Sequence, residues 1–554
     1  MTDSQHYANG NLKTFDSLSY PYPSARNLTY SRKGMVATSQ PLAAQAGLRM
    51  LQNGGNAIDA AIAAAACLTV VEPTSCGLGG DAFALVWHGG ELHGLNSSGK
   101  SPKSISIDKV KAMGHEHMPA RGFTPVTVPG IPGGWAALSK RFGKLPLTDV
   151  LAPAIEYADE GFPISPNLGK MWSRAFSFFK KNLHPAQNEE FAPWFDTFTS
   201  RADNSRPPEI GEMWSSPGHA KTLEEIVRTN AASFYNGNLA QKIDDFSKKH
   251  NGFITADDLA AFSPEWVNPI SVNYRGYNVW EIPPNGQGIV ALIALNILKG
   301  FDFSAKESAD TYHKQMEAMK LAFSCGKKAV TDPDHMEVTV GELLSDSFAT
   351  DLRKTITETA HEPIAYLPPK SGTVYLAAAD GEGNMISFIQ SNYMDFGSGI
   401  VIPGTGIALQ NRAVDFSLDA SHINALAPEK RTYHTIIPGF LTKGSTPVGP
   451  FGVMGGYMQP QGHTQVIMNT VDFGLNPQSA LDAPRWMWTS GKRFEVEGHF
   501  PRHIAEELSR RGHQIVPALD SMAFGRGQII WRDADSGVLV GGTESRTDGA
   551  VVGV

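Results

Sequence analysis

The pattern of apolar and polar positions predicts helices and strands mixed along the whole chain. Residues 57–71 are apolar on every side, which predicts a helix buried between two layers. Asn56 can cap this helix, and Asp59 in its first turn suits the helix dipole. Most of 133–262 also has a helical pattern. Mixed elements of this kind favour stacked sheets covered by helices.

Strand patterns accompany these helices. Two runs on either side of Gly89-Gly90 predict a hairpin, and residues 373–390 predict two short strands around a turn at 380–383. Residues 273–282 alternate in the manner of one strand. Turns and strand-like runs then dominate from 373 to the C-terminus, so we expect that part to be rich in strands.

Composition narrows the class of protein. The chain has 554 residues, of which 41% are hydrophobic and only 18% charged. Because a typical charged share is about 25%, this composition suits a compact body and excludes an acidic disordered protein or a coiled coil. One large core, or three to four domains of about 150 residues, would fit the length. The net charge of −8, with no basic run, argues against a nucleic-acid partner.

Cysteine usage and the N-terminus indicate a compartment. The three cysteines include no C-x-x-C pair, which argues against a disulfide framework and against a zinc site. The first 26 residues have neither a basic nor an apolar segment of the kind found in signal peptides. The most apolar run, 57–71, is shorter than the ~20 residues that a bilayer requires. We therefore expect a cytoplasmic protein without a membrane span.

The Gly372-Thr373 pair is a candidate site of self-cleavage. An extended polar segment reaches a small residue, and a hydroxyl residue then opens a strand. The threonine hydroxyl can attack the preceding carbonyl, and the N→O acyl shift that follows breaks the C–N bond and frees the threonine amine. Hydrolysis of the resulting ester then separates the two chains and restores the hydroxyl. That amine can then serve as general base for its own hydroxyl. A Gly-Thr pair at the start of a strand is, however, most often only structural.

Two glycine-rich segments have alternative interpretations. Gly455-Gly456 can present adjacent backbone N–H groups to a developing oxyanion, or can form a plain turn. The segment 76–81, CGLGGD, can bind phosphate as a backbone nest, although tight packing is favoured because no lysine and no Rossmann pattern accompany it. His115-Glu116-His117 can ligate a metal, but a solvated loop is the favoured interpretation.

Several segments in the same order resemble the gamma-glutamyltransferase family of N-terminal-nucleophile (Ntn) hydrolases. These segments include GMVATSQPLAAQAGLRMLQNGGNAIDAAIAA, VEPTSCGLGGDAF, TVPGIPGGWAAL, PPNGQG, GTVYLAAADGEGNMIS, FGSGI and VDFGLNPQSALDAPRW. The resemblance covers nearly the whole chain. It implies an α+β fold, a four-layer αββα sandwich, made as one proenzyme. The cut would fall between Gly372 and Thr373 and give a large chain, 1–372, and a small chain, 373–554, which together form one interleaved domain.

The resemblance also implies roles for individual residues. Thr373 matches the nucleophile, and Ser391 stands where the family has a hydroxyl that contacts the nucleophile's amine. Gly455 and Gly456 match the oxyanion-hole glycines. Asp415 matches the acidic residue that holds the α-amino group of the substrate.

Other family positions differ in this chain. Ser98 stands where γ-glutamyl-specific members have the arginine that clamps the substrate α-carboxylate. His434-Thr435 replaces the serine pair that contacts the same carboxylate. Tyr393 and Arg412 align with the substrate-side asparagine and glutamine. The residues for breaking an amide are therefore retained, and the residues that recognise a γ-glutamyl group are not.

This pattern resembles the cytoplasmic amidase branch of the family, which includes oxamate amidohydrolase-like and acylase-like members. We predict an amidohydrolase that acts on a small acidic, oxamate-like amide. Arg412 can replace the lost anion partner, with His434 as a second partner. Arg412 can equally pair with Asp415, and His434 can be a core histidine.

Two further functions stay open. The protein can be a genuine γ-glutamyltransferase that uses Arg412 or Lys100 in place of the lost arginine, or a non-catalytic homologue that binds a small molecule. We expect no metal and no organic cofactor. The expected partners are a small-molecule amide and the two associating chains of one proenzyme, with neither nucleic acid nor membrane, and a homo-oligomer of the processed heterodimer remains possible.

Overall fold

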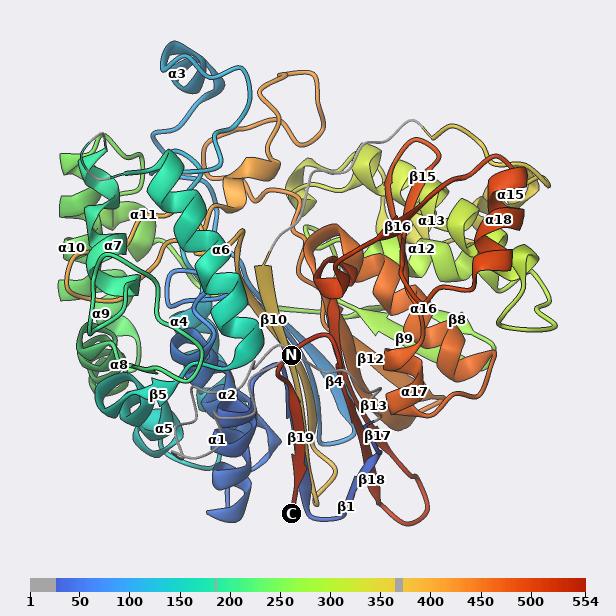
Figure 1. The fold of residues 1–554 in the computed structure, drawn as a ribbon, viewed down its shortest axis with the longest axis horizontal. Helices are drawn as coiled ribbons and strands as arrows, with labels where there is room; N and C mark the ends of the chain where they lie inside the picture. Colours follow the sequence, from blue (N-terminus) through green and yellow to red (C-terminus); the bar gives the residue numbers. More distant parts are fainter. Residues whose placement is uncertain (1–25, 185, 187, 364–371) are drawn as a thin grey trace, which may run out of the picture.

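Two seven-stranded antiparallel sheets form the centre of the computed structural model, which describes residues 26–184, 186, 188–363 and 372–554 (Figure 1). The first sheet has the order β19 (Ala550–Gly553), β2 (Gly34–Thr38), β10 (Gly372–Asp380), β11 (Met385–Tyr393), β3 (Asp81–His88), β4 (Glu91–Ser97), β7 (Glu265–Val267). The second sheet has the order β1 (Thr29–Ser31), β18 (Leu539–Thr543), β17 (Arg526–Arg532), β13 (Thr446–Met454), β12 (Gly439–Lys443), β9 (Tyr277–Glu281), β8 (Ile270–Tyr274).

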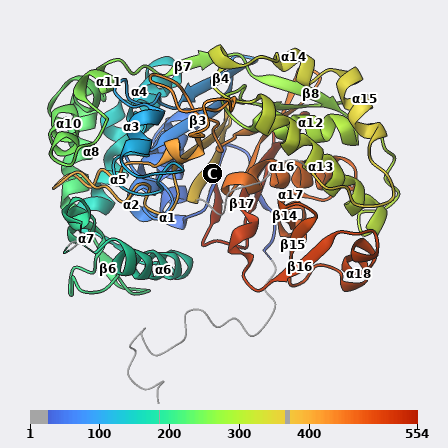
Figure 2. The ribbon, with the colours of Figure 1, turned by 90° about the horizontal axis from the view of Figure 1, so that it is seen from above.

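A layer of helices covers the outer face of each sheet (Figures 1 and 2). The helices on the side of the first sheet are α1 (Pro41–Gln52), α2 (Ala57–Val71), α4 (Ile131–Phe142), α5 (Leu147–Glu160), α6 (Pro166–Asn182), α7 (Ala192–Phe198), α8 (Pro217–Thr229), α9 (Ala232–Asn236), α10 (Asn238–Lys249) and α11 (Ala256–Ala260). Those on the side of the second sheet are α12 (Gly288–Leu298), α13 (Ala309–Ala329), α14 (Val340–Leu343), α15 (Asp346–Lys354), α16 (Gln459–Val471), α17 (Pro477–Asp482) and α18 (Arg502–Arg510).

Three smaller elements lie outside these layers. They are α3 (Ile107–Ala112), a short pair of β5 (Phe162–Pro163) with β6 (Met213–Trp214), and a three-stranded sheet of β14 (Trp486–Ser490), β15 (Arg493–Glu497) and β16 (Gln514–Ala518).

Three hydrophobic cores separate the four layers. One lies between the first sheet and its helices, one between the second sheet and its helices, and a smaller one between the two sheets. Because each sheet buries both faces, its central strands are apolar on both sides, and β10 and β11 are buried throughout. The four-layer αββα sandwich expected from the sequence is confirmed.

Helix α2 follows the sequence prediction closely. Asn56 accepts hydrogen bonds from the backbone N–H groups of Ile58 and Asp59, and Asp59 accepts in return from Asn56, which completes a capping box. All 15 residues of the helix are buried. Its alanines allow α1 and the strands β10 and β11 to pack closely against it.

Two predictions about strands are wrong. Residues 273–282 do not form one strand, because the chain turns back at Arg275 and Gly276, whose φ angles are +52° and +87°, and so makes the β8–β9 hairpin. The part after 373 is not dominated by strands alone, since α16, α17 and α18 lie there. Helices α16 and α17 pack their apolar faces on the second sheet. Their apolar residues therefore give strand-like runs in the sequence.

Each sheet combines strands that precede Gly372 in the sequence with strands that follow it. In the first sheet β10 and β11 lie between β2 and β3, and in the second β9 pairs with β12. Two chains made by a cut at Gly372 would therefore remain joined by strand pairing and a shared core. Within the described ranges no helix is both long and apolar enough to cross a membrane. The first 25 residues, where we expect no signal pattern, lie outside those ranges.

Candidate active site

Thr373 lies at an irregularity in the pairing of β10 with β11. Gly372 pairs with Tyr393 and Val374 with Gln390, so two residues of β11 oppose the single residue Thr373. Such a bulge changes the direction in which nearby side chains point. Tyr393 has a φ of +75°, a region that bulky residues rarely occupy and that is found mainly at functional sites. Thr373 itself is fully buried.

Ser391 connects the Thr373 hydroxyl with the carbonyl that this hydroxyl would attack. Ser391 Oγ lies 3.0 Å from Thr373 Oγ1 and donates to the Gly372 carbonyl oxygen at 2.8 Å. The backbone N–H of Tyr393 donates to Ser391 Oγ at 2.7 Å. Since the Ser391 proton is directed to Gly372, the Thr373 hydroxyl is the donor in its contact with Ser391. This chain of hydrogen bonds can draw a proton from the nucleophile while polarising the scissile carbonyl.

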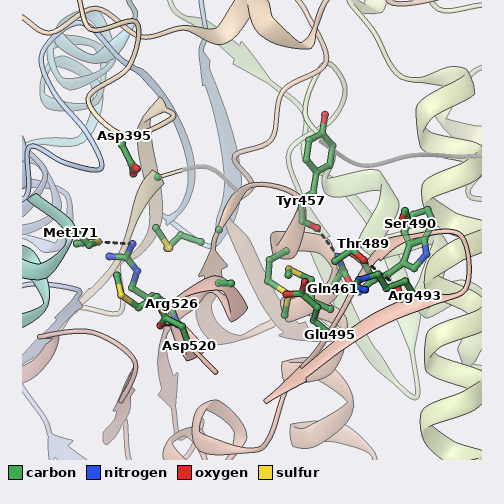
Figure 3. Close-up of a pocket in the computed structure, with 18 of the residues that line it drawn as sticks. Met171, Asp395, Tyr457, Gln461, Thr489, Ser490, Arg493, Glu495, Asp520 and Arg526 are labelled. Atoms are coloured by element: carbon green, nitrogen blue, oxygen red, sulfur yellow. Dashed lines mark hydrogen bonds and ion pairs between the residues drawn. The ribbon is translucent and has the colours of Figure 1, made fainter. Parts of the chain in front are cut away.

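The two glycines predicted for the oxyanion hole follow directly after β13. Gly455 has a φ of +138° and Gly456 a φ of +58°, both in the region that favours glycine. The side-chain amide of Gln287 donates to the Gly456 carbonyl at 2.8 Å and holds the turn in place. Gly455 and Gly372 line the same cavity, of about 510 Å³ (Figure 3). Once the Gly372–Thr373 bond is cut, the new amine of Thr373 would stand at the wall of this cavity.

Arg412 lies in a short 3₁₀ turn, Arg412–Asp415, with its side chain only 1% exposed. Its guanidinium stacks on the Tyr393 ring at 4.2 Å, and Nη1 donates to Thr435 Oγ1 at 2.7 Å. Nε is 3.6 Å from a carboxylate oxygen of Asp81, and Nη1 is 4.0 Å from one of Asp415. Nε and Nη2 have no hydrogen-bond partner among the described residues. The buried cation therefore keeps donors that an anionic ligand can use.

Asp415 is held by two tyrosine hydroxyls. Tyr393 donates to its Oδ1 at 3.0 Å and Tyr457 donates to the same oxygen at 2.6 Å. The other oxygen, Oδ2, has no hydrogen-bond partner within the part of the chain that the structure describes. A carboxylate with one oxygen fixed and the other available can accept a hydrogen bond from a substrate ammonium group.

His434 contacts Asp81 and not the guanidinium. Its Nδ1 accepts from the backbone N–H of Ile436 at 3.4 Å, so Nε2 carries the proton and donates to Asp81 at 3.0 Å. Burial, together with the charges of Arg412 and Arg431, lowers the pKa of His434 well below its usual value. His434 is therefore neutral and orients Asp81, while the positive charge of the site comes from Arg412.

Two functional candidates were not identified from the sequence. Asp81, the last residue of the glycine loop, lies opposite Ser391 on the adjacent strand. Lys327, on α13, is half-buried, with Nζ 4.0 Å from the centre of the Tyr457 ring and hydrogen-bonded to the Tyr457 hydroxyl. Burial lowers the pKa of Lys327 to about 8, against the opposing charge of Asp415. The sequence carried no distinct signal for Lys327, because the same helix also contains Asp310, Lys314, Glu317, Lys320 and Lys328.

Ser98 lies in a polar group of its own. Its hydroxyl donates to Asn96 at 2.7 Å, and its carbonyl accepts from Arg431 Nε at 3.0 Å. No hydrogen bond joins Ser98 to Arg412 or Asp415 among the described residues. The predicted site residues thus form two groups. The first consists of Thr373, Ser391 and Gly372, and the second of Arg412, Asp415, Tyr393 and Thr435. Tyr457 contacts Asp415 of the second group and lines the same cavity as Gly372 of the first.

The glycine loop at 76–81 is packed tightly. A Cβ on Gly79 would lie 2.4 Å from the Ala408 carbonyl oxygen, and one on Gly80 would lie 2.5 Å from that of Ser391. These glycines therefore allow close approach of the backbone beside the junction, which agrees with the packing interpretation of the segment.

Asp81 gives the site a pH dependence. Burial raises the pKa of Asp81 to about 7, although Arg412 opposes the shift. Below that pH the carboxyl is neutral and Arg412 is free to bind an anion, whereas above it Asp81 competes for the guanidinium. We expect the KM for an anionic substrate to rise as the pH increases through 7. If the bound anion raises the pKa of Asp81 by one unit, the enzyme with protonated Asp81 binds that anion about tenfold more tightly than the enzyme with ionised Asp81.

The measurement is KM against pH between 6 and 8 for the parent enzyme and Asp81→Asn. The asparagine variant should lose the rise in KM near pH 7, because its side chain cannot ionise. An unchanged pH dependence in Asp81→Asn would assign the ionisation to another group.

The described residues contain one group of side chains that could hold a metal ion: His313, Glu317 and His513. His313 Nδ1 and His513 Nε2 are 2.8 Å apart, and Lys320 Nζ lies 2.6 Å from Glu317. The lysine already supplies a cation to the carboxylate. None of these side chains contacts Thr373 or Arg412 by a hydrogen bond, so no step of the chemistry is assigned to them.

The chain belongs to the gamma-glutamyltranspeptidase family, because the model of that family matches residues 43–554. Its relatives are Ntn hydrolases and acylases, and the protein is an enzyme of this class. The family recognised from the sequence motifs is therefore confirmed.

Three similar proteins span nearly the same length. The glutathione hydrolase-like YwrD proenzyme of Bacillus subtilis (strain 168) is 39% identical over 534 residues, or 94% of this chain and 98% of the relative. The oxamate amidohydrolase proenzyme of Klebsiella pneumoniae is 32% identical over 537 residues, or 94% and 99%. The crystal structure of cephalosporin acylase from Bacillus halodurans has a TM-score of 0.94 and 62% identity, covering 98% and 99%.

Proposed function

We propose that the chain cuts itself before Thr373 and then hydrolyses an amide whose acyl half carries an anionic group. The observation that carries this proposal is the hydrogen-bond chain from Thr373 through Ser391 to the Gly372 carbonyl. In an uncut chain this arrangement places the nucleophile, a proton acceptor and the scissile carbonyl in contact. The proenzyme names of three relatives agree with such processing.

The proposed reaction uses the new N-terminus. Thr373 Oγ1 attacks the substrate carbonyl carbon, and its proton passes to the free α-amine of Thr373. The N–H groups of Gly455 and Gly456 stabilise the tetrahedral oxyanion. As the C–N bond breaks, the α-ammonium returns the proton to the leaving amine. Water then hydrolyses the acyl-enzyme, with the α-amine again accepting a proton.

Arg412 supports an anionic acyl half. Its guanidinium is buried, has donors without a hydrogen-bond partner among the described residues, and takes the family position of a substrate-side glutamine. Oxamate amidohydrolase and cephalosporin acylase are the names of two similar proteins, and both name amide-cleaving enzymes. We propose an oxamate-like or short dicarboxylic acyl group as the preferred class.

A γ-glutamyl substrate is the second candidate. It is favoured by Asp415, whose free oxygen can hold an α-ammonium while Arg412 holds the α-carboxylate 4.0 Å away. Several relatives are named glutathione hydrolases, at 27–29% identity.

A matched substrate panel on the processed protein tests the proposal. Amides of one amine with oxalic, succinic, glutaric and γ-glutamic acids are compared by kcat/KM, alongside an uncharged acyl group of similar length. The dicarboxylic amides should exceed the uncharged one by at least tenfold. A γ-glutamyl amide turned over much faster than all others would favour the second candidate. No turnover of any amide by a fully processed protein would overturn the proposed function.

A further inference from the structure

Five methionines and two aromatic residues line the cavity at the candidate active site, together with charged and polar side chains. Its wall includes Met171, Met454, Met458, Met487, Met522 and Trp488. Methionine is unbranched and polarizable, so surfaces rich in it adapt to apolar ligands of different shape. These residues come from α6, β13, the 3₁₀ turn after it, β14 and the turn before β17, and they converge only in the folded chain.

The charges on the cavity wall are balanced. Three arginines and three carboxylates line it, and Arg526 and Asp520 lie on one side with Arg493 and Glu495 on the other (Figure 3). The arginines have carboxylate partners: Arg174 with Asp520 at 3.1 Å, Arg493 with Glu495 at 3.7 Å, and Arg526 with Glu72 at 2.9 Å. The wall therefore offers no net charge to attract an anionic or a cationic ligand.

The size of the cavity also limits what it can hold. Its volume of about 510 Å³ is typical of sites for drug-sized ligands, roughly 300–1,000 Å³. Ammonia, the leaving amine of a primary amide such as oxamate, is about as large as a water molecule, roughly 30 Å³. A primary amide would leave most of the apolar wall in contact with water.

We propose that this cavity binds the amine half of the substrate, and that this half is an extended apolar or aromatic group. The inference rests on the proposed function, since it assigns the leaving side of the same reaction. It extends that function by naming the class of amine: neither ammonia nor a charged peptide, but an uncharged group large enough to contact several of the methionines.

Tyr457 lies between the regions proposed for the acyl half and the amine half of the substrate. Its hydroxyl donates to Asp415 at 2.6 Å, while the residue also lines the cavity beside Gly455. The Arg412–Asp415 side is closed, with Arg412 only 1% exposed, and carries the charges that suit the acyl half. The cavity side is open, and its methionines lie among arginines that have carboxylate partners. A substrate carbonyl at the glycines thus directs its acyl group to Arg412 and its amine group to the methionines.

A series of amides of one acid tests this assignment. The amines are methylamine, butylamine and 2-(2-naphthyl)ethylamine, all of them alkylamines, so the leaving-group chemistry stays similar while apolar size increases. We expect kcat/KM of the processed enzyme to rise at least tenfold from the methyl amide to the naphthylethyl amide. Free 2-(2-naphthyl)ethanol, an uncharged probe, should inhibit competitively, and methanol should not.

Substitutions in the wall supply the structural control. Met487→Glu and Met171→Glu introduce a charge at half-buried positions, and Met487→Leu and Met171→Leu keep the apolar surface. The glutamate variants should lose most of the preference for the naphthylethyl amide, measured as the ratio of its kcat/KM to that of the methyl amide. The leucine variants should retain the preference.

The outcomes separate this inference from the proposed function. Hydrolysis of all three amides at similar rates, or fastest hydrolysis of the methyl amide, would overturn the assignment of the cavity while leaving the amidohydrolase in place. A preference for the naphthylethyl amide that the glutamate variants do not reduce would also overturn it. A processed protein that hydrolyses none of the three, and fails on the acyl panel, would overturn the proposed function.

Discussion

Thr373→Ala is expected to remain a single chain of 554 residues and to hydrolyse no amide at a measurable rate. The substitution removes the only hydroxyl that contacts Ser391 next to the Gly372 carbonyl among the described residues. Loss of a nucleophile typically lowers kcat by about 10⁴-fold or more. Because Thr373 is buried beside a bulge and alanine is smaller, the fold should persist. Intact mass spectrometry and an amide hydrolysis assay check the two results.

Two variants at the same junction serve as controls. Thr373→Ser keeps a hydroxyl and should still be cut, at a reduced rate. Ser391→Ala keeps the nucleophile but removes the hydrogen bond to the Gly372 carbonyl, so cutting should slow by at least tenfold while the same cut is made. Cutting of Thr373→Ala at the normal position would assign the nucleophile to another residue.

Arg412→Gln is expected to lower kcat/KM for an anionic amide by about 10- to 100-fold, since a hydrogen bond to a charged group contributes roughly 1.5–3 kcal/mol. An uncharged amide of the same length should lose far less. Arg412→Lys keeps the charge but not the planar, two-pronged geometry, and should recover only part of the loss. The measurement is kcat/KM for both amides, with thermal denaturation to verify folding.

Lys100→Gln is the matched control for Arg412. Lys100 is the other cation that the sequence offers in place of the lost family arginine, and it lies two residues from Ser98. We expect Lys100→Gln to leave the preference for anionic amides unchanged. If it lowered kcat/KM for the anionic amide more than Arg412→Gln does, Lys100 would be the anion partner.

The local elements of the fold could be predicted from the sequence because they depend on neighbours along the chain. The all-apolar pattern at 57–71 and the capping residue Asn56 define a buried helix, and turn residues define the β3–β4 and β10–β11 hairpins. The β8–β9 hairpin was missed because its turn contains Arg275, which adopts a positive φ that the residue type does not favour.

The candidate site could be predicted only in part. Family motifs point to Thr373, Ser391 and the two glycines, because those residues occur in short ordered segments. Asp81 and Lys327 were missed, since a charge that packing brings next to an active site has no local pattern. Asp81 comes within reach of Arg412 through the pairing of β3 with β11, and Lys327 reaches Tyr457 through the packing of α13 on the second sheet side.

The sequence by itself determined the family and the four-layer class of fold, and it predicts a junction between Gly372 and Thr373. Only the tertiary structure decided how Ser391 joins the Thr373 hydroxyl to the Gly372 carbonyl, and how the buried charges of Asp81, Arg412 and Asp415 face one another. It also decided that methionines from separate elements line one cavity. The reason is physical: helices and hairpins arise from contacts between near neighbours, whereas a site depends on strand register and on which distant side chains lose water together.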